Sequence, residues 1–519
     1  MDIWRKVADF LVTPAAYVQS EPVQVIETSI SMVFLAGPHA YKIKKPVILG
    51  YLDFSTPDLR REDCEREVTL NRRTAPSLYL DSVAVTLEAD GSMALDGKGV
   101  PVEWAVKMRR FDSEALLDHM ASRGTLDIPL IARLAHSIAV FHTALAPEYD
   151  VGGVADFRRT LMSNDAEYRD FSETVFQIEA INALRDASLA KLDSNTVLLD
   201  ARREAGWVRH CHGDLHLANI FCQDGEPTPF DCITFNDRIA KIDILYDLAF
   251  LLMDLWRRGL KQHANHCLNQ YIAQLSPASA EACIEGLGLL PVFLSSRAGV
   301  RAFVMAQTSR AQPDNAGLIS DAREYFELAQ SFLRPPPPRL IAVSGLSGSG
   351  KSVLARALAP NVGALPGAVI LRSDEIRKQL AGMPLLEPLP SAAYTPESSA
   401  LVYACIVKRT RAALCAGHSV IADAVYARAE ERATIEAIAH EAGVPFQGLW
   451  LDAPPEVLAN RVGARRGDAS DANAAVVRQQ LEYDTGSISW ARVDAGGTPD
   501  ETLGKAVRAL GLERDSMVH

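Results

Sequence analysis

The chain has 519 residues, 48% of them hydrophobic, which is enough apolar material for two or three separate cores. Its formal net charge of −12 argues against broad binding to nucleic acid or to an anionic membrane, while a local basic pocket for phosphates stays compatible with it. The first residues lack a secretory leader and no apolar run reaches the roughly 18 residues of a membrane span, so we expect a cytoplasmic protein without a membrane partner. The eight cysteines contain no C-x-x-C pair, and we expect free thiols.

The N-terminal part begins with predicted strands and a helix that together carry two candidate lysines. The strands are expected at 29–35, 39–44 and 104–108 and the helix at 60–73. Lys42 and Lys44 share one face of the second strand, where a solvated basic edge is the alternative interpretation. Kinase folds require a helix glutamate paired with a strand lysine. The helix offers Glu65 and Glu67, and we expect Glu67 to be the partner.

Candidate phosphotransfer residues follow in the segment His-Cys-His-Gly-Asp-Leu-His-Leu-Ala-Asn-Ile at 210–220. Phosphoryl transfer needs a carboxylate that orients or deprotonates the attacking hydroxyl, and oxygen ligands that hold magnesium on the phosphates. Asp214 and Asn219, five residues apart, fit these roles, and Asp231 fits the principal magnesium ligand because it ends the next short apolar strand.

Two other interpretations of the segment were weighed. A metal site of nitrogen and sulfur ligands would use His210, Cys211, His212, His216 and Cys222, but their spacing matches no common zinc pattern and leaves Asp214 and Asn219 unexplained. An ordinary turn would not explain why magnesium-type residues recur in this order. A second cluster, His263, His266 and Cys267, receives no role.

The pattern H-G-D-x-H-x-x-N, followed by an apolar strand and an aspartate, resembles the aminoglycoside phosphotransferase family, which is related to the protein kinases. The resemblance covers about the first 330 residues and implies a two-lobed kinase-like fold. It implies a catalytic base, two magnesium ligands, a phosphate-binding lysine and its helix partner, which are Asp214, Asn219 and Asp231, Lys42 and Glu67. Residues 243–250 resemble the family's structural segment after the metal aspartate. The chain departs from the antibiotic kinases at Ile233, where they usually have glycine, and shows no aminoglycoside-binding acidic loop.

The middle of the chain predicts a domain boundary. Helical spacing over 251–333 should complete a helical lobe, and the four prolines at 335–338 should form a stiff polyproline segment. We therefore expect a kinase-like domain at 1–334, with an N-lobe to about 108 and a helical lobe from 109, and a second domain at 339–519.

The second domain opens with an unbroken G-x-x-x-x-G-K-S phosphate loop at 345–352, between a predicted strand at 339–343 and a predicted helix at 353–358. In such a loop backbone N–H groups turn inward, the lysine reaches the terminal phosphates and the last hydroxyl joins the magnesium shell. The residues expected to bind the nucleotide are Gly345, Gly348, Ser349, Gly350, Lys351 and Ser352. The expected cofactors are ATP or GTP with Mg²⁺.

Further strands are predicted at 368–371, 419–423 and 448–452, and charged residues follow them, where ligands collect in open α/β sheets. Asp423 suits a Walker B ligand of magnesium. Asp374 and Arg377 would project toward an acceptor, although a helix cap and a solvated arginine also explain them. Arg461 and Arg465, with the neighbouring arginine at 466, could close over the phosphates from a helix.

This order of strand, phosphate loop, S-D-x-x-R, strand with aspartate and arginine-rich lid resembles the small P-loop kinases, which include gluconate kinase, adenylylsulfate kinase, chloramphenicol phosphotransferase, polynucleotide kinases and zeta-type toxins. The resemblance covers about 339–519. It implies that Asp374 activates the acceptor hydroxyl and Arg377 grips the acceptor. It also implies that Arg461 and Arg465 stabilise the transferred charge.

The whole chain resembles fused bacterial proteins that place an aminoglycoside-phosphotransferase-like domain before a P-loop kinase domain. The expected fold class is α/β with α+β, and the expected function is a bifunctional ATP- and magnesium-dependent kinase that phosphorylates hydroxyls of small molecules. The alternatives are a regulatory or toxin-like kinase acting on a protein, a nucleotide sugar or a nucleic-acid end, or one domain that only senses nucleotide. The acidic charge disfavours a nucleic-acid partner, and the oligomeric state is left open.

Overall fold

The computed structural model describes residues 3–17, 21–50, 52–315 and 317–512, which form two compact units. The first unit contains the chain up to Leu130 together with Val140–Gly152 and Gly206–Asp247. The second contains Ile131–Ala139, Gly153–Ala205 and the chain from Leu248 onward. The helices from 248 to 334 thus pack into the same unit as the phosphate-loop sheet. The predicted division at the four prolines does not follow this packing, and it stays a prediction about chain organisation.

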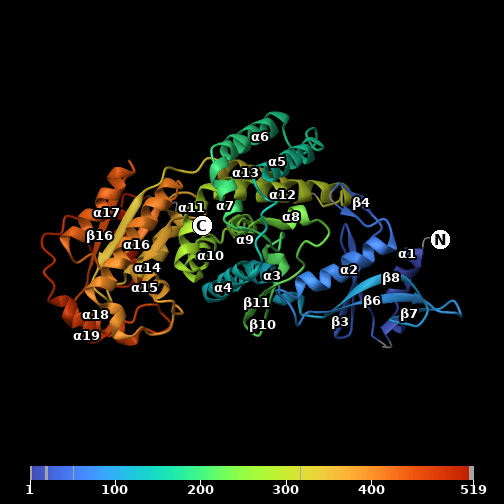
Figure 1. Cartoon of the computed structure of the whole chain (residues 1–519), viewed down its shortest axis with the longest axis horizontal. Coiled ribbons are helices and arrows are strands. Elements are labelled where there is room, and N and C mark those ends of the chain that lie inside the picture. The colour runs from blue at the N-terminus through green and yellow to red at the C-terminus, as the bar shows by residue number, and fades with distance from the viewer. Residues whose placement is uncertain (1–2, 18–20, 51, 316, 513–519) are drawn as a thin grey trace. The chain divides into compact units, whose positions relative to one another are not determined.

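The first unit is built on a six-stranded antiparallel sheet with the order β1-β2-β3-β8-β6-β7. Its strands are β1 Gln24–Glu27, β2 Ser31–Ala36, β3 His39–Lys44, β6 Tyr79–Leu87, β7 Met93–Leu95 and β8 Val100–Arg109. Helix α2 (Pro57–Asn71) lies along the sheet (Figure 1) and begins where the Thr56 hydroxyl accepts a hydrogen bond from the N–H of Leu59. The three predicted strands and the predicted helix of this region are confirmed within a few residues at each end.

Alternation along β3 decides which side chains face helix α2. Tyr41 and Ile43 join α1 (Ile3–Leu11) in one hydrophobic cluster, while Ala40 joins α2 in another on the opposite face. Because side chains of a strand alternate between the two faces, Lys42 and Lys44 point to the α2 side.

Two short two-stranded antiparallel sheets complete the first unit and carry its candidate catalytic loop. Strand β9 (Val208–His210) pairs with β12 (Lys241–Asp243), and β10 (Ile220–Gln223) pairs with β11 (Glu226–Pro229). The smaller elements of the unit are β4 Ile48–Leu49, β5 Leu52–Asp53, α3 Leu117–Ser122 and α8 Asp237–Ala240. Loop 211–219 therefore joins two strands, and Asp231 follows the end of β11.

The second unit has a helical part and a sheet part. Its helices before the sheet are α5 Val154–Arg169, α6 Ile178–Asp193, α7 Thr196–Glu204, α10 Lys261–Gln274, α11 Pro277–Gly286, α12 Leu290–Ala311 and α13 Gly317–Phe332, while α4 (Ile128–Ala144) and α9 (Ile244–Arg257) belong partly to each unit. The helical prediction for 251–333 is confirmed. Among the described residues one helical stretch, Pro277–Ala311, has the length and apolar composition of a membrane span, and 72% of its most apolar window is buried inside the protein.

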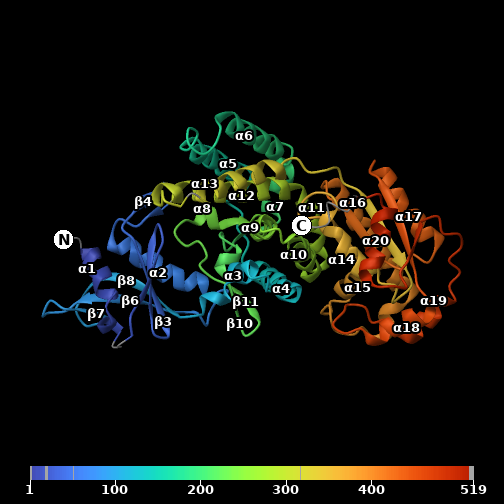
Figure 2. The same cartoon turned by 180° about the vertical axis from the view of Figure 1, so that it is seen from behind.

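The sheet part is a five-stranded parallel sheet with the order β14-β15-β13-β16-β17. Its strands are β13 Leu340–Gly345, β14 Val369–Arg372, β15 Val420–Asp423, β16 Phe446–Asp452 and β17 Ala491–Asp494, and its helices are α14 Lys351–Leu358, α15 Ser373–Leu380, α16 Pro396–Cys415, α17 Ala429–Glu441, α18 Pro455–Ala464, α19 Ala474–Leu481 and α20 Pro499–Ala509. Helices α14 and α20 pack together on one face, and α16 packs beside α17 (Figure 2). Because β13 lies between β15 and β16, the phosphate loop opens at the point where the strand order reverses.

Candidate active sites

Lys42 stands at the centre of the first candidate site. Its ammonium donates to Oε1 of Glu67 at 3.0 Å and to Oδ1 of Asp231 at 2.6 Å. Burial opposes the positive charge, but Asp231 and Glu67 outweigh it and raise the pKa of Lys42. The same lysine works against burial at Asp231 and lowers the pKa of that carboxyl. Strand β3, helix α2 and the loop after β11 thus meet at one charged group.

Lys44 lies one strand repeat further along and has a different environment. It is 2% exposed and is enclosed by Glu67 and by Asp63, whose Oδ2 lies 2.8 Å away. The hydroxyl of Thr234 donates to the other oxygen of Asp63 at 2.7 Å. Glu65, in contrast, is exposed and lies 3.8 Å from its helix neighbour Arg61. Glu67 therefore contacts both lysines. Lys42 is the lysine that also contacts Asp231.

The catalytic-loop candidates contact one another. Nδ2 of Asn219 donates to Oδ2 of Asp214 at 2.8 Å and to its backbone carbonyl at 2.9 Å, and His216 lies 3.4 Å from the same carboxylate. Because both contacts of the Asn219 side chain with Asp214 use Nδ2, its carbonyl oxygen Oδ1 is left for a ligand among the described residues. The carboxylate of Asp214 is accordingly oriented within the loop.

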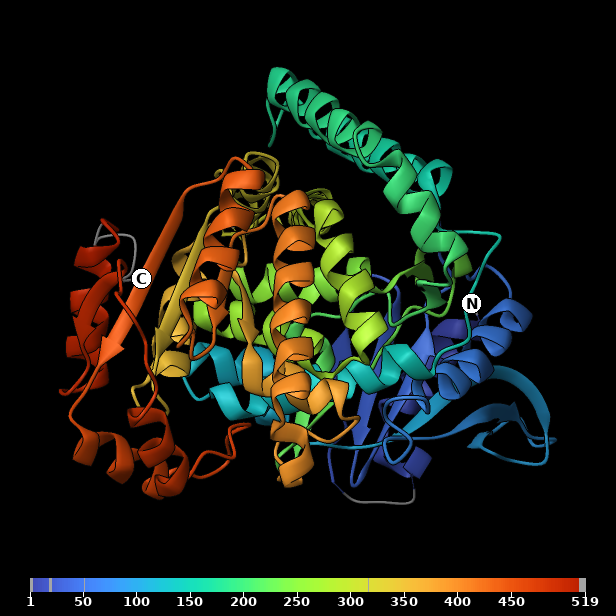
Figure 3. The same ribbon diagram turned by 60° about the vertical axis from the view of Figure 1, so that its left-hand side comes forward.

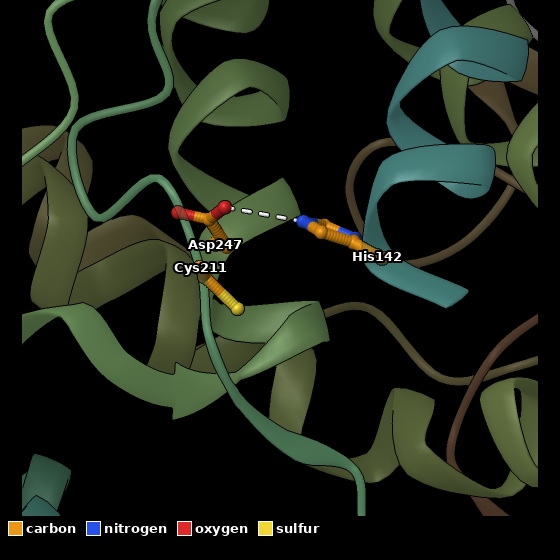
Figure 4. Close-up of side chains that lie close together, drawn as sticks. All are labelled: His142, Cys211 and Asp247. Carbon is orange, nitrogen blue, oxygen red and sulfur yellow. Dashed lines mark hydrogen bonds and ion pairs between the residues drawn. The ribbon is translucent and has the colours of Figure 1, made fainter. Parts of the chain in front are cut away.

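Asp247, in the first turn of α9, supports this loop from behind. Its two carboxylate oxygens accept the backbone N–H groups of His212 at 3.1 Å and Gly213 at 2.8 Å. His142, at the end of α4, lies 3.1 Å from the same carboxylate, and Figure 4 shows the two side chains pointing toward each other beside Cys211. All three side chains are buried. The sequence resemblance covered the segment of Asp247 but signalled neither the residue's contact with the loop nor His142.

Asp231 is also held by its backbone. It has a left-handed φ of +59°, and its N–H donates to the hydroxyl of the buried Tyr79 at 3.1 Å. The next N–H, that of Cys232, donates to Oδ1 of Asn71 on α2 at 2.9 Å. At Ile233, where the chain departs from the antibiotic kinases, the side chain packs against Gly213 and the N–H donates to the carbonyl of His212. Isoleucine is therefore accommodated by packing on the catalytic loop.

The donor set of this site fits a magnesium nucleotide. Asp231, whose side chain is 42% exposed, and the amide oxygen of Asn219 are hard oxygen ligands, the type that Mg²⁺ prefers. The ammonium of Lys42 lies beside them as a phosphate-binding cation.

The alternative set of nitrogen and sulfur ligands is not assembled. Within the described part of the chain, the one group of three metal-type side chains is His142, Cys211 and Asp247. His212 instead lies 2.8 Å from the carbonyl of Phe230 through Nε2. Burial lowers the pKa of His210 to about 4, aided by the positive charge of Arg73.

The second candidate site is the phosphate loop between β13 and α14. Gly348 has a φ of +85°, and a Cβ on it would lie 2.5 Å from the carbonyl oxygen of Leu458, so only glycine fits there. The hydroxyl of Ser352 donates to Oδ2 of Asp423 at 2.6 Å. Lys351 donates to the loop's own carbonyl at Leu346, 3.1 Å away.

The loop carries further signs of a phosphate site. Gly345 and Gly350 also have positive φ, and the buried Ser349 Oγ makes no hydrogen bond within the described residues. Burial lowers the pKa of Lys351, and its carboxylate neighbours offset this only in part. A buried hydroxyl, a lysine that forms no ion pair among the described residues and a serine–aspartate pair fit a magnesium nucleotide.

Arg372 is a central residue that sequence reasoning missed. It is 5% exposed at the end of β14 and lies within 4 Å of four carboxylates, those of Asp374, Glu375, Asp423 and Asp468. Burial opposes its charge, but these carboxylates together raise its pKa. Burial likewise raises the pKa of Asp423, against the effect of Arg372 and Lys351. The carboxyl ends of parallel strands lie at one edge of a sheet, and this arrangement could have predicted that the charged residues after these strands cluster around Arg372.

The acceptor-side candidates lie on α15. Asp374 lies 3.7 Å from Arg372 and is one-third exposed. Arg377 donates to the carbonyl of Ala393 at 2.7 Å and lies over the ring of Tyr394. Asp471, also missed from sequence, accepts from Lys378, from the N–H of Leu389 and from the hydroxyl of Tyr394. Asp471 thus joins three segments beside the phosphate-loop site.

The two lid arginines are placed differently from each other. Arg461 donates to the carbonyls of Ala495 at 2.8 Å and Gly497 at 2.6 Å, so in this structure it fastens α18 to the end of the sheet. Arg465 lies 3.7 Å from Asp468. Burial of Lys351 is the main cause of its lowered pKa, and the positive charge of Arg465 lowers that pKa further. Gln480 of α19, missed from sequence, accepts the phosphate-loop N–H of Ser347 at 2.7 Å.

Comparison with known proteins gives matches to both parts of the chain. The family described as "AAA domain" matches residues 340–484. An uncharacterized protein of Mycobacterium tuberculosis (strain ATCC 25618 / H37Rv) is 32% identical over 511 residues, which cover 94% of this chain and 96% of that protein. An adenylyl-sulfate kinase of Myxococcus xanthus (strain DK1622) is 32% identical over 122 residues, 24% of this chain and 62% of that enzyme. A solved choline/ethanolamine kinase family protein from Mesorhizobium loti is similar over 64% of this chain and 95% of its own, with 11% identity and a TM-score of 0.40.

The parallel sheet with its phosphate loop, the serine–aspartate pair, the family match and the similarity to an adenylyl-sulfate kinase define the class of the protein, which is a kinase. Its N-terminal part has the kinase-like combination of antiparallel sheet, lysine-bearing strand and glutamate-bearing helix. The chain belongs to the same family as the mycobacterial protein, which it matches over nearly its whole length.

Proposed function

We propose that the chain is a bifunctional phosphotransferase with two separate sites that each transfer the γ-phosphate of ATP, with Mg²⁺, to a hydroxyl of a small molecule. The observation that carries the first site is Lys42, which contacts both Glu67 and Asp231 beside the Asp214–Asn219 loop. The second site is carried by the phosphate loop, whose Ser352 contacts Asp423. Each set supplies a phosphate cation and oxygen ligands for a metal.

In the first site the residues divide the work of transfer. Glu67 holds Lys42, which binds the nucleotide phosphates, and Asp231 with the amide oxygen of Asn219 holds the magnesium. The bound magnesium neutralises the phosphate charge. Asp214 orients the acceptor hydroxyl and takes its proton, and Asn219 keeps the carboxylate in place at 2.8 Å.

In the second site Lys351 exchanges its contact with the Leu346 carbonyl for the nucleotide phosphates, which the loop N–H groups and the Ser349 hydroxyl also bind. Ser352 and Asp423 hold the magnesium. Asp374 takes the proton of the acceptor hydroxyl, and Arg377 binds the acceptor. For Arg465 we propose a role near the transferred phosphate because its charge acts on Lys351.

The deciding experiment is transfer from radiolabelled ATP with magnesium into a fractionated small-metabolite extract. Wild type, Asp214→Asn and Lys351→Ala are compared side by side, and Asp374→Asn reports on the second acceptor site. We expect two labelled products, one lost with Asp214→Asn and the other lost with Lys351→Ala and with Asp374→Asn, while the latter variant keeps its nucleotide affinity.

Other patterns of label would change the proposal. If a single product disappears in both Asp214→Asn and Lys351→Ala, the activity of one site depends on the other. Label found only on protein or nucleic acid replaces the small-molecule acceptor with a macromolecule. If both variants keep all labelled products, both assignments are contradicted.

A further inference from the structure

Strand β14 is an edge of the phosphate-loop sheet, and helix α10 covers its open side with two asparagines. The N–H of Ile370 donates to Oδ1 of Asn269 at 2.7 Å, and Nδ2 of Asn269 donates to the carbonyl of Ala368 at 3.2 Å. Asn265, one turn earlier, donates to the same carbonyl at 3.0 Å. An edge strand presents unpaired N–H and C=O groups, and here a helix supplies the partners that another strand would supply.

Gln379 of α15 makes a second connection to the same helix. It is 8% exposed, and its Nε2 lies 3.0 Å from each of three carbonyl oxygens, those of Ile272, Ala273 and Leu275, which share its two hydrogens. These carbonyls belong to the end of α10, where a helix has no internal donors for them. Oε1 of Gln379 accepts from the buried Arg409 of α16 at 2.7 Å. One amide on α15 therefore bonds to groups of two other helices, α10 and α16.

The two connections lie on either side of the acceptor-side segment. Asn269 holds β14 two residues before Arg372, and Gln379 follows Arg377 by two residues on α15. Asp374 lies between them. Figure 3 shows the upright orange helix α16 beside the yellow-green helices, to which Arg409 and Gln379 connect it. Buried amide groups that are fully hydrogen-bonded leave the segment little freedom to shift.

We propose that Asn269 and Gln379 are positioning residues through which helix α10 sets the location of Asp374 and Arg377 in the phosphate-loop site. This inference rests on the proposed acceptor role of Asp374 and Arg377. The acceptor side of the second site is then completed by a helix that precedes the four-proline segment. Nucleotide binding does not need this contact, because the phosphate loop and Asp423 belong to strands farther from the edge.

The test uses the full-length chain with Asn269→Leu and Gln379→Met, which remove the hydrogen bonds at similar volume. Two controls remove amide hydrogen bonds elsewhere in the same unit. Asn164→Leu removes the contact of a buried amide with Ser296, and Gln447→Met removes a bond of 2.9 Å to the carbonyl of Leu510. Neither control touches β14 or α15.

The first measurement is label transfer from radiolabelled ATP into the small-metabolite extract, in an Asp214→Asn background so that only the second site contributes. In both variants we expect transfer to fall by at least about tenfold while the affinity for a non-hydrolysable ATP analogue changes by less than about twofold. The two controls, compared at the temperature where their folded fractions match, should keep most of their transfer. If the loss of transfer is explained by the loss of folded protein, to the same extent in Asn269→Leu, Gln379→Met and the two controls, the proposal is overturned.

The second measurement needs no substrate. Amide hydrogen exchange should lose protection over 368–377 in Asn269→Leu and Gln379→Met, and should keep it over the phosphate loop at 345–352. Unchanged protection over 368–377 overturns the positioning role. If wild type shows no transfer that depends on Lys351, the proposed function fails, and the exchange result still decides whether α10 positions this segment.

Discussion

The two candidate sites hold their phosphate-binding lysines in opposite ways. Lys42 contacts two carboxylates, which raise its pKa against the effect of burial. Lys351 donates to a backbone carbonyl and forms no ion pair within the described residues, and burial lowers its pKa. A lysine that already forms ion pairs is held in place, but it must give up part of its contact with the carboxylates to bind a phosphate. A lysine that contacts a backbone carbonyl gives up no ion pair when it binds the ligand.

The carboxylates around each lysine explain this difference. In the first site Glu67 comes from a helix packed on the sheet, and Asp231 comes from a neighbouring loop. In the second site Asp423 is engaged by Ser352 and lies near Arg372, so its charge is shared. The buried arginine there has the pairing role that a lysine has in the first site. The comparison predicts that removal of the buried Lys44 lowers stability, whereas removal of Lys351 lowers activity.

The largest expected effect on stability is that of Lys44→Met. The change leaves Asp63 and Glu67 as buried carboxylates with one cation fewer, and a broken buried pair typically costs about 3–5 kcal/mol. Urea unfolding measures the loss. The matched variant Lys42→Met, whose lysine is more exposed, should lose less stability and more transfer at the first site. Equal stability loss in both variants would contradict the division between the two lysines.

Lys351→Ala should have the largest effect on activity. The ammonium lies on the phosphate loop without a carboxylate partner, so its loss removes phosphate binding and little folding energy. Loss of one such charge-stabilising group lowers turnover by on the order of 10²–10³-fold. Steady-state transfer at the second site measures it, with melting temperature as the control. A large fall in melting temperature would mean that Lys351 is a structural cation like Lys44.

The stability of the second unit should fall at acidic pH because of His418. Burial lowers its pKa to about 4 from 6.5, and its Nε2 lies 3.1 Å from the carbonyl of Leu287. Since the folded state binds the proton less well, the contribution is complete above pH 6.5 and is lost as the pH falls toward 4. At pH 5 the linkage amounts to about 2 kcal/mol.

Urea unfolding at pH 7 and pH 5 of wild type and His418→Gln tests this. The variant should lose about 2 kcal/mol less than wild type on acidification. His210→Gln is the matched variant in the first unit, where burial is less complete and the pKa is also about 4. An identical pH dependence in wild type and His418→Gln would contradict the prediction.

The smallest expected effect is that of Asp247→Asn. Two backbone N–H groups of the catalytic loop bond to this carboxylate, and an amide offers an acceptor to only one of them. We expect first-site turnover to fall about tenfold, the equivalent of about one lost hydrogen bond to a charged group, with nucleotide affinity retained. Second-site transfer in the same preparation is the internal control. A fall in both activities would show that Asp247 supports folding rather than the loop.

Much of both sites was predictable because the chemistry is local in sequence. The phosphate loop, the loop at 211–219 and the aspartates after β11 and in β15 each lie in one short segment, and the structure places each where strands end. Residues whose role depends on other segments were missed. Arg372 gains its importance only from carboxylates up to 96 residues away, and Asp471 from Lys378 and Tyr394.

The division of the chain was also only partly predictable. The four prolines lie between α13 and β13 in the chain, since polyproline joins neither a helix nor a sheet. They do not show that α10 completes the edge of that sheet, because Asn269 and Ile370 are 101 residues apart. A polar residue on a helix looks the same in sequence whether it faces water or a strand.

The sequence by itself therefore determined the classes of element, the nucleotide loop and the residue types able to transfer a phosphate, because glycine conformations, strand alternation and oxygen ligands are properties of short segments. Only the tertiary structure decided which lysine meets Asp231 and which helix pairs with the open edge of β14. Those outcomes depend on packing between distant segments, where a shift of one residue exchanges a buried side chain for an exposed one.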